Sequence, residues 1–293
     1  MTSPQEVITS RDNTLIKELR KLAQDGAAYR KSGRVWIEGE HLCDAAQARG
    51  LIAEIAVISD RNQHLAGIES ARSATKLVVI ADALMREISG LESPAAIALV
   101  LALPQEKAVD ASARSVILDR LQDPGNAGSI LRSAAAFGYA QIIALSGTVA
   151  LWSPKVLRAG MGAHFSLRIV EAASIEQLLD LKHPLAVTSS HQGEYLHELQ
   201  MRNMQITKTL QKSEHSAQDI CRQLADFAWI MGHEGQGASE ELQSMAKVHV
   251  RIAQPGGQES LNVAAAAAVC LHASASASAS VSSTMATENA AHR

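Results

Sequence analysis

Three turns constrain the fold of this chain more than any other feature, because each joins an apolar, strand-like run to a helix-like run. They cover Asp123–Arg132, Gly232–Gly237 and Ser260–Val263. Around the first turn, the runs Ser115–Asp119 and Gln141–Leu145 give the order strand, helix, strand, which is typical of a parallel sheet with a right-handed crossover. In such sheets, ligands bind beyond the carboxyl ends of the strands. The sequence therefore predicts an α/β fold in which all three turns form one composite site.

Changes in the hydropathy pattern predict two domains. Helix-like and strand-like runs alternate up to Pro104, beginning with a helix over residues 6–34, and a polar, unpatterned stretch follows. From about Gln192 to Gln218 the chain is again polar, which favours a long loop or weak helices. The Ala-Ser alternation that follows Leu271 is typical of a disordered tail. The predicted parts are a small N-terminal α/β domain (1–104), a linker (105–114), a parallel-sheet α/β domain (115–272) and the tail (273–293).

The charge of the chain limits the partners that it can bind. The net charge is −3, so a globally basic nucleic-acid-binding protein is not indicated and any RNA contact must come from a local patch. One candidate patch lies in residues 1–34, which contain seven Lys and Arg residues but only four Asp and Glu residues. A solvated helix face explains the same pattern, and both interpretations stay open at this point.

The cysteines and apolar segments exclude several further classes of protein. Cys43, Cys221 and Cys270 are far apart and form no C-x-x-C pair, so we expect neither a disulfide framework nor a metal site. Free cysteines fit a reducing cytoplasm. The first residues contain no apolar stretch, so no secretory signal is expected. The run Val263–Leu271 is too short to span a membrane and is predicted to be a buried helix.

The first turn combines backbone freedom with polar side chains at the start of a helix. Pro124 fixes φ, and two glycines relieve the backbone. Asn126 is expected either to cap the helix or to hold a group of a ligand. Arg132 lies one turn further and can reach back over the helix N-terminus, where anions are favoured. The alternative for this segment is a capped helix that carries a surface arginine.

The second and third turns favour a flat ligand over a phosphate. The second has the spacing G-x-x-G-x-G and no Walker lysine, so a phosphate cradle is poorly supported and close approach of backbone to a flat ligand fits better. Its Glu234 can accept a hydrogen bond, whereas His233 is expected to be exposed or satisfied. In the third turn, Ser260 and Asn262 offer a hydroxyl and an amide, although Ser260 alone is also a typical N-cap. No G-x-S-x-G motif is present, so a hydrolase is not indicated.

Together, the three turns resemble the motifs of the SpoU family of RNA methyltransferases, within the knotted SPOUT superfamily. The similarity covers residues 115–271. The opening of the chain also resembles the small ribosomal-protein-like α/β domain that helps some relatives to hold RNA. The residues that carry the resemblance are Asp123, Pro124, Asn126, Gly128, Ile130, Arg132, Ala134, Phe137 and Gly138, then Gly232, Glu234 and Gly235, then Ile252 and Ser260–Val263, and in the opening Ser10–Leu22 and Trp36–Leu42.

The resemblance implies a ribose 2′-O-methyltransferase that uses S-adenosylmethionine and no metal, with a C-terminal trefoil knot. It also implies a cytoplasmic homodimer with sites beside the dimer interface, no membrane partner, and ribosomal RNA rather than transfer RNA as the favoured substrate. The implied methyl-donor contacts are Gly232, Ile252 and Leu261, and the implied catalytic set is Asn126, Arg132, Glu234, Ser260 and Asn262. The residues expected to bind RNA are Lys17, Arg20, Lys21, Arg30, Lys31, Lys155 and Arg158.

One departure from the family pattern and several alternatives remain. Many relatives have proline directly after the residue that matches Ile252, whereas this chain has Ala253 there and Pro255 two positions further on. A nicotinamide-dependent dehydrogenase would need a G-x-G-x-x-G after the first strand, and none is found. A non-catalytic RNA-binding relative, a transfer RNA substrate and methylation of a base stay open. A guanidinium does not normally accept a proton, so Arg132 is not expected to act as a general base. We expect it to bind a phosphate and to stabilise developing alkoxide charge.

Overall fold

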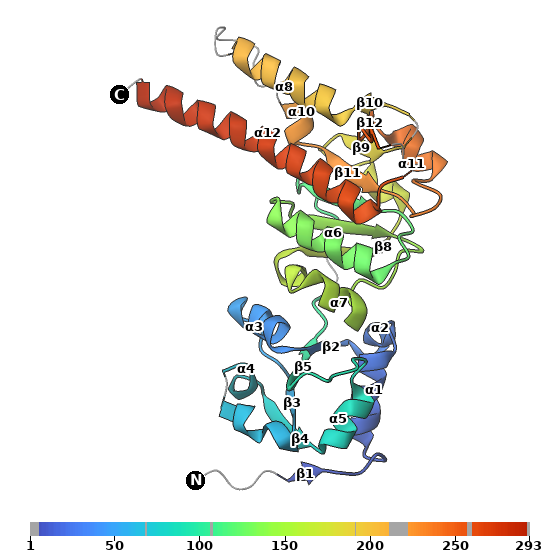
Figure 1. Ribbon diagram of the computed structural model, residues 1–293, viewed down its shortest axis with the longest axis vertical. Coiled ribbons are helices and arrows are strands. Elements are labelled where there is room, and N and C mark those ends of the chain that lie inside the picture. The colour runs from blue at the N-terminus through green and yellow to red at the C-terminus, as the bar shows by residue number, and fades with distance from the viewer. Residues whose placement is uncertain are drawn as a thin grey trace. The chain divides into compact units, whose positions relative to one another are not determined.

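The structure, a computed structural model, describes residues 6–67, 69–105, 108–190, 192–210, 222–256 and 260–291. The chain forms two compact units (Figure 1). The first comprises the chain up to Gln105 together with Ala150–Ser166, and the second comprises Glu106–Val149 and the chain from Leu167 onward. Within the described ranges, none of the helices has the length and the hydropathy needed to cross a membrane.

The first unit is built on a five-stranded mixed sheet in the order β1-β4-β3-β5-β2. The strand β5 is antiparallel to both of its neighbours, whereas β1, β4 and β3 are parallel. The core between the sheet and the helices is mainly aliphatic around one tryptophan, Trp36. The strands are β1 (Val7–Ile8), β2 (Arg34–Glu38), β3 (Ile55–Ser59), β4 (Lys76–Ile80) and β5 (Ile97–Ala102). The helices are α1 (Thr14–Gln24), α2 (Ala28–Ser32), α3 (Glu40–Ala48), η1 (Asp60–Gly67), α4 (Glu69–Arg72), α5 (Asp82–Ile88), α7 (Pro154–Gly160) and η2 (Ala163–Ser166).

The single helix predicted over residues 6–34 is wrong, because local capping breaks this stretch into shorter elements. Asn13 begins α1, and its side-chain oxygen accepts a hydrogen bond from the Leu15 amide at 2.9 Å. Asp25 ends α1 in an extended conformation. Gly33, with φ of +65°, ends α2 and turns the chain into β2. The apolar spacing identified only the middle part, where Ile16 and Leu19 are buried.

The helix α7 packs with the first unit, although the sequence placed it in the domain 115–272. Its start agrees with the prediction, because Ser153 accepts a hydrogen bond from the Val156 amide and Pro154 occupies the first turn. Val156 and Leu157 are fully buried, and α7 lies against β2. Burial of this apolar face, which sequence order cannot reveal, accounts for the assignment to the first unit.

The second unit contains a seven-stranded sheet in the order β10-β12-β9-β11-β6-β7-β8, and every neighbouring pair is parallel. The predicted α/β fold with a parallel sheet is thereby confirmed. Its central strands are apolar and buried on both faces, as parallel strands usually are. The strands are β6 (Ser115–Leu118), β7 (Gln141–Leu145), β8 (Arg168–Ala173), β9 (Leu185–Thr188), β10 (Glu194–Tyr195), β11 (Ala228–Met231) and β12 (Val248–Arg251). The helices are α6 (Pro124–Ala136), η3 (Ile175–Leu178), α8 (Leu196–Leu210), α10 (Arg222–Ala225), α11 (Glu240–Met245) and α12 (Val263–Ala291).

The expected linker and the expected polar loop are partly structured. In the stretch 105–114, Asp110 is held to the second unit, because its amide donates to the Gln141 side chain at 2.8 Å and its carbonyl accepts from the same side chain at 3.2 Å. In the stretch 192–218, residues 196–210 form α8, and residues 211–221 lie outside the described residues. The short helix α11, capped by Ser239, was not predicted.

The disordered tail expected from residue 273 is wrong for its first part, because α12 continues through it. Ala273, Ser274 and Ala277 are buried. The indole nitrogen of Trp229 donates to the Ser274 hydroxyl at 3.0 Å, and both residues are fully buried. In Figure 1, α12 runs beside α6, and the two helices are in contact. Small side chains and the high helix propensity of alanine let this Ala-Ser stretch form a close-packed helix.

Candidate functional site

The site of the second unit lies where the chain leaves β6 and β11 and where α12 begins. The Asp119 amide donates to the Met231 carbonyl at 2.9 Å, so the ends of β6 and β11 stay joined beyond the strands themselves. Residues 119–126 follow β6, and residues 232–237 follow β11. The parallel sheet therefore delivers both turns to one edge, as expected for the carboxyl ends of neighbouring strands.

In the first turn, the helix cap is Asp123 rather than Asn126. The Asp123 carboxylate accepts a hydrogen bond from the Asn126 amide at 2.7 Å, and Pro124 occupies the first helical position. Because Asp123 satisfies the exposed end of α6, the Asn126 side chain is left for other contacts. The Asn126 side chain makes these contacts with the second and third turns. Its Nδ2 donates to Glu234 Oε1 at 3.2 Å, and its Oδ1 accepts from Asn262 Nδ2 at 3.0 Å.

The second turn needs glycine at its start. A Cβ on Gly232 would lie 2.2 Å from the Ala238 nitrogen, so any side chain there would collide with backbone. His233 and Gly237 exchange both backbone hydrogen bonds, at 3.0 and 2.8 Å. The His233 ring nitrogen Nδ1 also accepts from the amides of Gly235 and Gln236. The expectation of a satisfied histidine is therefore confirmed, and the closed turn leaves Glu234 pointing toward the first turn.

Glu234 joins the second turn to the first. Its carboxylate accepts hydrogen bonds from the amides of Gln122 and Asp123, at 3.2 and 3.0 Å, as well as from Asn126. Partial burial raises the pKa of Glu234, but the hydrogen bonds, led by that from the Asp123 amide, outweigh burial and leave the pKa below its ordinary value. The side chain is therefore a carboxylate at neutral pH and holds the first turn in place by accepting hydrogen bonds.

Asn262 begins the third part of the site and caps α12. Its Oδ1 accepts hydrogen bonds from the amides of Ala264 and Ala265, at 2.9 and 3.2 Å. The alternative in which Ser260 caps this helix is therefore wrong, since the helix starts after Asn262. Ser260 is exposed, and Leu261 exposes 40% of its surface. Ile252 is half-buried just after β12.

Arg132 is not part of this hydrogen-bonded network. It lies on α6, on the exposed face that also carries Ser129. Among the residues that the structure describes, no hydrogen bond or ion pair is found for its guanidinium. The structure thus brings together Asn126, Glu234 and Asn262 and leaves the arginine facing solvent, with its donors available.

The basic residues expected to bind RNA all belong to the first unit, but acids neutralise some of them. Lys17 pairs with Asp12 at 3.0 Å, and Arg20 pairs with Glu87 at 2.9 Å. Arg30 stays near its neighbour, with Nε donating to the Tyr29 hydroxyl at 3.2 Å. The remaining members of the set are Lys21, Lys31 and Lys155, which are exposed, and Arg158, which is half-buried.

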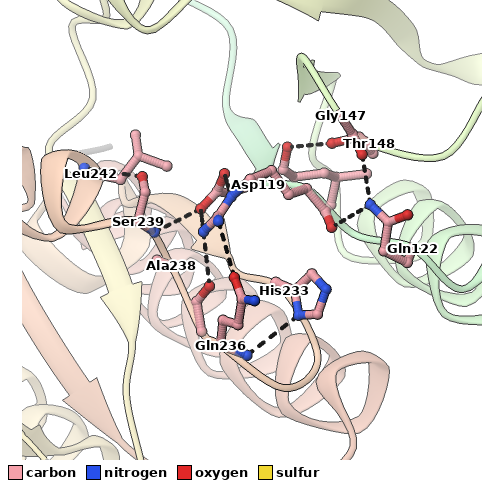
Figure 2. Close-up of polar contacts among 12 residues, drawn as sticks. Asp119, Gln122, Gly147, Thr148, His233, Gln236, Ala238, Ser239 and Leu242 are labelled. Atoms are coloured by element: carbon pink, nitrogen blue, oxygen red, sulfur yellow. Dashed lines mark hydrogen bonds and ion pairs between the residues drawn. The ribbon is translucent and has the colours of Figure 1, made fainter.

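Sequence reasoning missed a charged pair at the end of β6. Asp119, only 3% exposed, holds the Arg120 guanidinium, and Arg120 reaches the second turn. Figure 2 shows Asp119, Ser239 and Gln236 around this strand end, with Gln122 and Gly147 on the other side. An acidic residue directly after a buried strand was the available signal. No group of three or more His, Cys, Asp or Glu residues suited to a metal ion occurs among the described residues.

Comparison with known proteins agrees with this geometry. The sequence profile of the SpoU rRNA Methylase family matches residues 113–272. The chain is 29% identical to the 23S rRNA (guanosine(2553)-2′-O)-methyltransferase RlmP of Bacillus subtilis, over 90% of this chain and 97% of that protein. It is 31% identical to an uncharacterized tRNA/rRNA methyltransferase of Synechocystis, over 93% of this chain and 94% of that protein.

Solved structures give the same assignment of fold. An RNA 2′-O ribose methyltransferase superposes with a TM-score of 0.67 at 27% identity and covers 92% of this chain and 98% of its own. An AdoMet-bound rRNA methyltransferase from Sinorhizobium meliloti shares the fold, with a TM-score of 0.72 at 22% identity over 93% of this chain and 98% of its own. With its three turns assembled at one sheet edge and the family profile matched over more than half of its length, the chain belongs to the SpoU rRNA Methylase family.

Proposed function

We propose that the protein transfers a methyl group from S-adenosylmethionine to a ribose 2′-hydroxyl of ribosomal RNA. The observation that carries the proposal is the hydrogen-bonded chain from Glu234 through Asn126 to Asn262, which unites three turns far apart in sequence. The relative RlmP, similar over nearly its whole length, is named for ribose methylation of 23S rRNA. That name favours ribosomal RNA over transfer RNA, and the ribose over a base.

The residues proposed to hold the methyl donor suit a ligand that is bound largely through backbone and apolar contact. Leu261 presents an exposed apolar side chain beside Asn262, and Ile252 is half-buried at the end of β12. At Gly237, where φ is +69°, a Cβ would meet no atom within 4 Å, so the surface next to the turn is open. When bound, S-adenosylmethionine supplies a methyl group activated by a sulfonium cation.

Arg132 is proposed to bind a phosphate of the RNA and to stabilise negative charge that develops on the ribose oxygen. Its guanidinium does not accept a proton under physiological conditions, so water or a phosphate oxygen takes the hydroxyl proton. The roles proposed for the other residues follow from their contacts. Asn126 and Asn262 orient the acceptor, Glu234 fixes the first turn, and the exposed Ser260 hydroxyl binds the substrate. Preorganised donors of this kind are ordinarily worth about 10²–10³ in rate.

The family resemblance supports the finer architecture that we propose. Residues 1–104 serve as an RNA substrate-binding domain, with the exposed Lys21 and Lys31 as its main phosphate contacts, and the exposed Lys155 of α7 adds a further one. Residues 115–272 form a methyltransferase domain in which the segment after β12 completes a trefoil knot. Two copies of the chain associate as a homodimer in the cytoplasm, with their sites beside the interface.

Mapping of 2′-O-methylation tests the proposal directly. Total RNA is compared between cells with and without the protein, and between cells complemented with the wild type or with Arg132→Ala. We expect one ribosomal ribose methylation to disappear with the protein, to return with the wild type and not to return with the variant. Loss of a transfer RNA methylation in place of a ribosomal one, or an unchanged map, would each contradict the proposal.

A further inference from the structure

Asp119 and Arg120 form a bidentate ion pair between neighbouring residues, at the carboxyl end of β6. Arg120 Nε donates to Asp119 Oδ1 at 2.9 Å, and its Nη2 donates to Oδ2 at 3.1 Å. The Ser239 amide donates to the same Oδ2 at 2.7 Å. The Asp119 side chain is buried, whereas the Arg120 side chain is 35% exposed. The carboxylate thus fixes both its neighbour and the start of α11 (Figure 2).

This pairing requires an uncommon backbone conformation. Arg120 has φ of +54°, a region that glycine adopts readily and that other residues adopt rarely. The turned backbone carries the guanidinium back over Asp119. The backbone itself is held on its other side, because Gln122 Nε2 donates to the Arg120 carbonyl at 2.9 Å and to the Gly147 carbonyl at 2.7 Å. An arginine in a backbone conformation that favours glycine indicates that the arginine side chain itself is needed at this position.

The guanidinium reaches the second turn of the site. Arg120 Nη1 donates to Gln236 Oε1 at 3.3 Å, and Nη2 lies 3.5 Å from the Gly237 carbonyl oxygen, which it reaches as a long hydrogen bond. Gly237 closes the turn through its two backbone hydrogen bonds with His233. Arg120 therefore connects the buried end of β6 to the part of the turn opposite Glu234. With Glu234 bound to the first turn and Gln236 bound to Arg120, the turn is held on two sides.

We propose that Arg120 is a positioning residue for the methyl donor, because it fixes the turn 232–237 in the conformation that binds the donor. This inference rests on the proposed function, in which Gly232 contacts the donor. Arg120 acts through the turn and touches neither the donor nor the acceptor ribose. Its loss is expected to loosen the turn and to weaken donor binding more than it slows methyl transfer.

Three variants separate this role from a general loss of structure. Arg120→Gly removes the side chain and suits the positive φ, so the backbone carries no added strain. Arg120→Lys keeps the charge but cannot span Asp119 and the turn together, because it lacks the guanidinium fork. Arg168→Ala is the matched control, since Arg168 belongs to the same unit, pairs with Asp110 at 3.9 Å and is 34% exposed. Thermal melting of each variant checks that the fold is intact.

Donor binding and turn mobility are then measured on the full-length protein. For Arg120→Gly we expect the dissociation constant of S-adenosylmethionine, by calorimetry, and its KM to rise about tenfold, within the range of coupling through a positioning network. We expect kcat and the KM for RNA to change by less than about threefold, the lysine variant to be intermediate and the control to match the wild type. Hydrogen exchange at the amides of residues 233–239 should accelerate in Arg120→Gly, less so in Arg120→Lys, and not in the control.

The outcomes distinguish the two proposals. If wild-type protein binds no S-adenosylmethionine, the proposed function fails, while hydrogen exchange, which needs no donor, still decides whether Arg120 fixes the turn. An unchanged donor affinity in Arg120→Gly, beside normal binding by the wild type, overturns the inference. A raised KM for RNA with an unchanged KM for the donor also overturns it, because Arg120 would then contact the RNA. Unchanged hydrogen exchange at residues 233–239 would mean that Arg120 does not fix the turn, and it would overturn the inference as well.

Discussion

Replacing Glu234 by glutamine tests whether one carboxylate organises the site. The carboxylate accepts two backbone amides of the first turn, those of Gln122 and Asp123, and the Asn126 amide group. Glu234→Gln keeps the size of the side chain but replaces one acceptor oxygen by an NH₂ group. At least one donor of the first turn then faces another donor, so the first turn is expected to shift relative to the second.

The expected loss of stability is small and the expected loss of rate is large. A hydrogen bond to a charged group contributes about 1.5–3 kcal/mol when buried, but Glu234 is exposed and water compensates in part. We therefore expect the free energy of unfolding to fall by about 1 kcal/mol, which lowers Tm by about 2–4 °C for a domain of this size. Misplacing the reacting groups by even about 1 Å costs roughly 10²-fold in rate. Glu240→Gln, which changes an exposed carboxylate in the first turn of α11, serves as the control.

The pH dependence gives the same test a defined sign. The pKa of Glu234 is lowered in the folded state, so its contribution to stability is fully present above the ordinary glutamate pKa of about 4.3. That contribution is lost as the pH falls through the lowered value. Denaturant titrations of the wild type and Glu234→Gln should therefore differ at pH 7 and converge once the pH falls below the lowered pKa. Equal stability at pH 7, or a kcat within about threefold of the wild type, would refute the reasoning.

Four further outcomes are expected. Arg132→Lys should lower kcat by about 10²–10³ with an unchanged Tm, because Arg132 is exposed; near-wild-type turnover in a methylation assay would contradict a bidentate role. Burial lowers the pKa of His164 to about 4, so the wild type should lose roughly 3 kcal/mol of unfolding free energy as the pH falls from about 6.5 to about 4, and His164→Leu should show no such loss in denaturant titrations. Ser274→Ala leaves the buried Trp229 indole N–H without its acceptor, so the free energy of unfolding should fall by about 1–3 kcal/mol in denaturant titrations. The control Ser276→Ala removes an exposed hydroxyl of the same helix, beside His272, and should lower it by less than about 0.5 kcal/mol. Alanine at Lys21 or Lys31 should reduce the slope of log RNA affinity against log salt by about 0.7 each; filter binding with an unchanged slope would remove these residues from the interface.

Most strands of both units were predictable, because they are short runs of apolar residues that the parallel or mixed sheet buries, whereas the two-residue strands β1 and β10 were missed. Val116, Ile117 and Leu118 illustrate this, since all three are fully buried in β6. The C-terminal stretch was not predictable from composition. Alternating Ala and Ser has no strong periodicity, yet Ala273, Ser274 and Ala277 occupy one buried face of α12. Only the partner surfaces, which lie far away in sequence, decide between disorder and a packed helix.

The sequence predicted which residues form the site better than it predicted the hydrogen bonds and helix caps that connect them. The side chains of Asn126, Glu234 and Asn262 were expected to meet because their turns follow strands or begin a helix at one edge. Which residue caps which helix was not predictable, because a cap depends on the φ and ψ of one position. The same limit hid Arg120, whose positive φ no sequence pattern for an arginine would suggest.

The hydrogen-bond inventory of the three side chains explains how a structural network can also bind a substrate. Asn262 Oδ1 accepts two amides of α12, so its acceptor capacity is used. Asn126 donates once to Glu234 and accepts once from Asn262, which fixes the direction of its amide and leaves it one N–H and one lone pair. A ribose hydroxyl both donates and accepts, so it matches that remaining pair. Under the proposed function, we therefore expect the internal hydrogen bonds to hold Asn126 in the orientation that the acceptor hydroxyl needs.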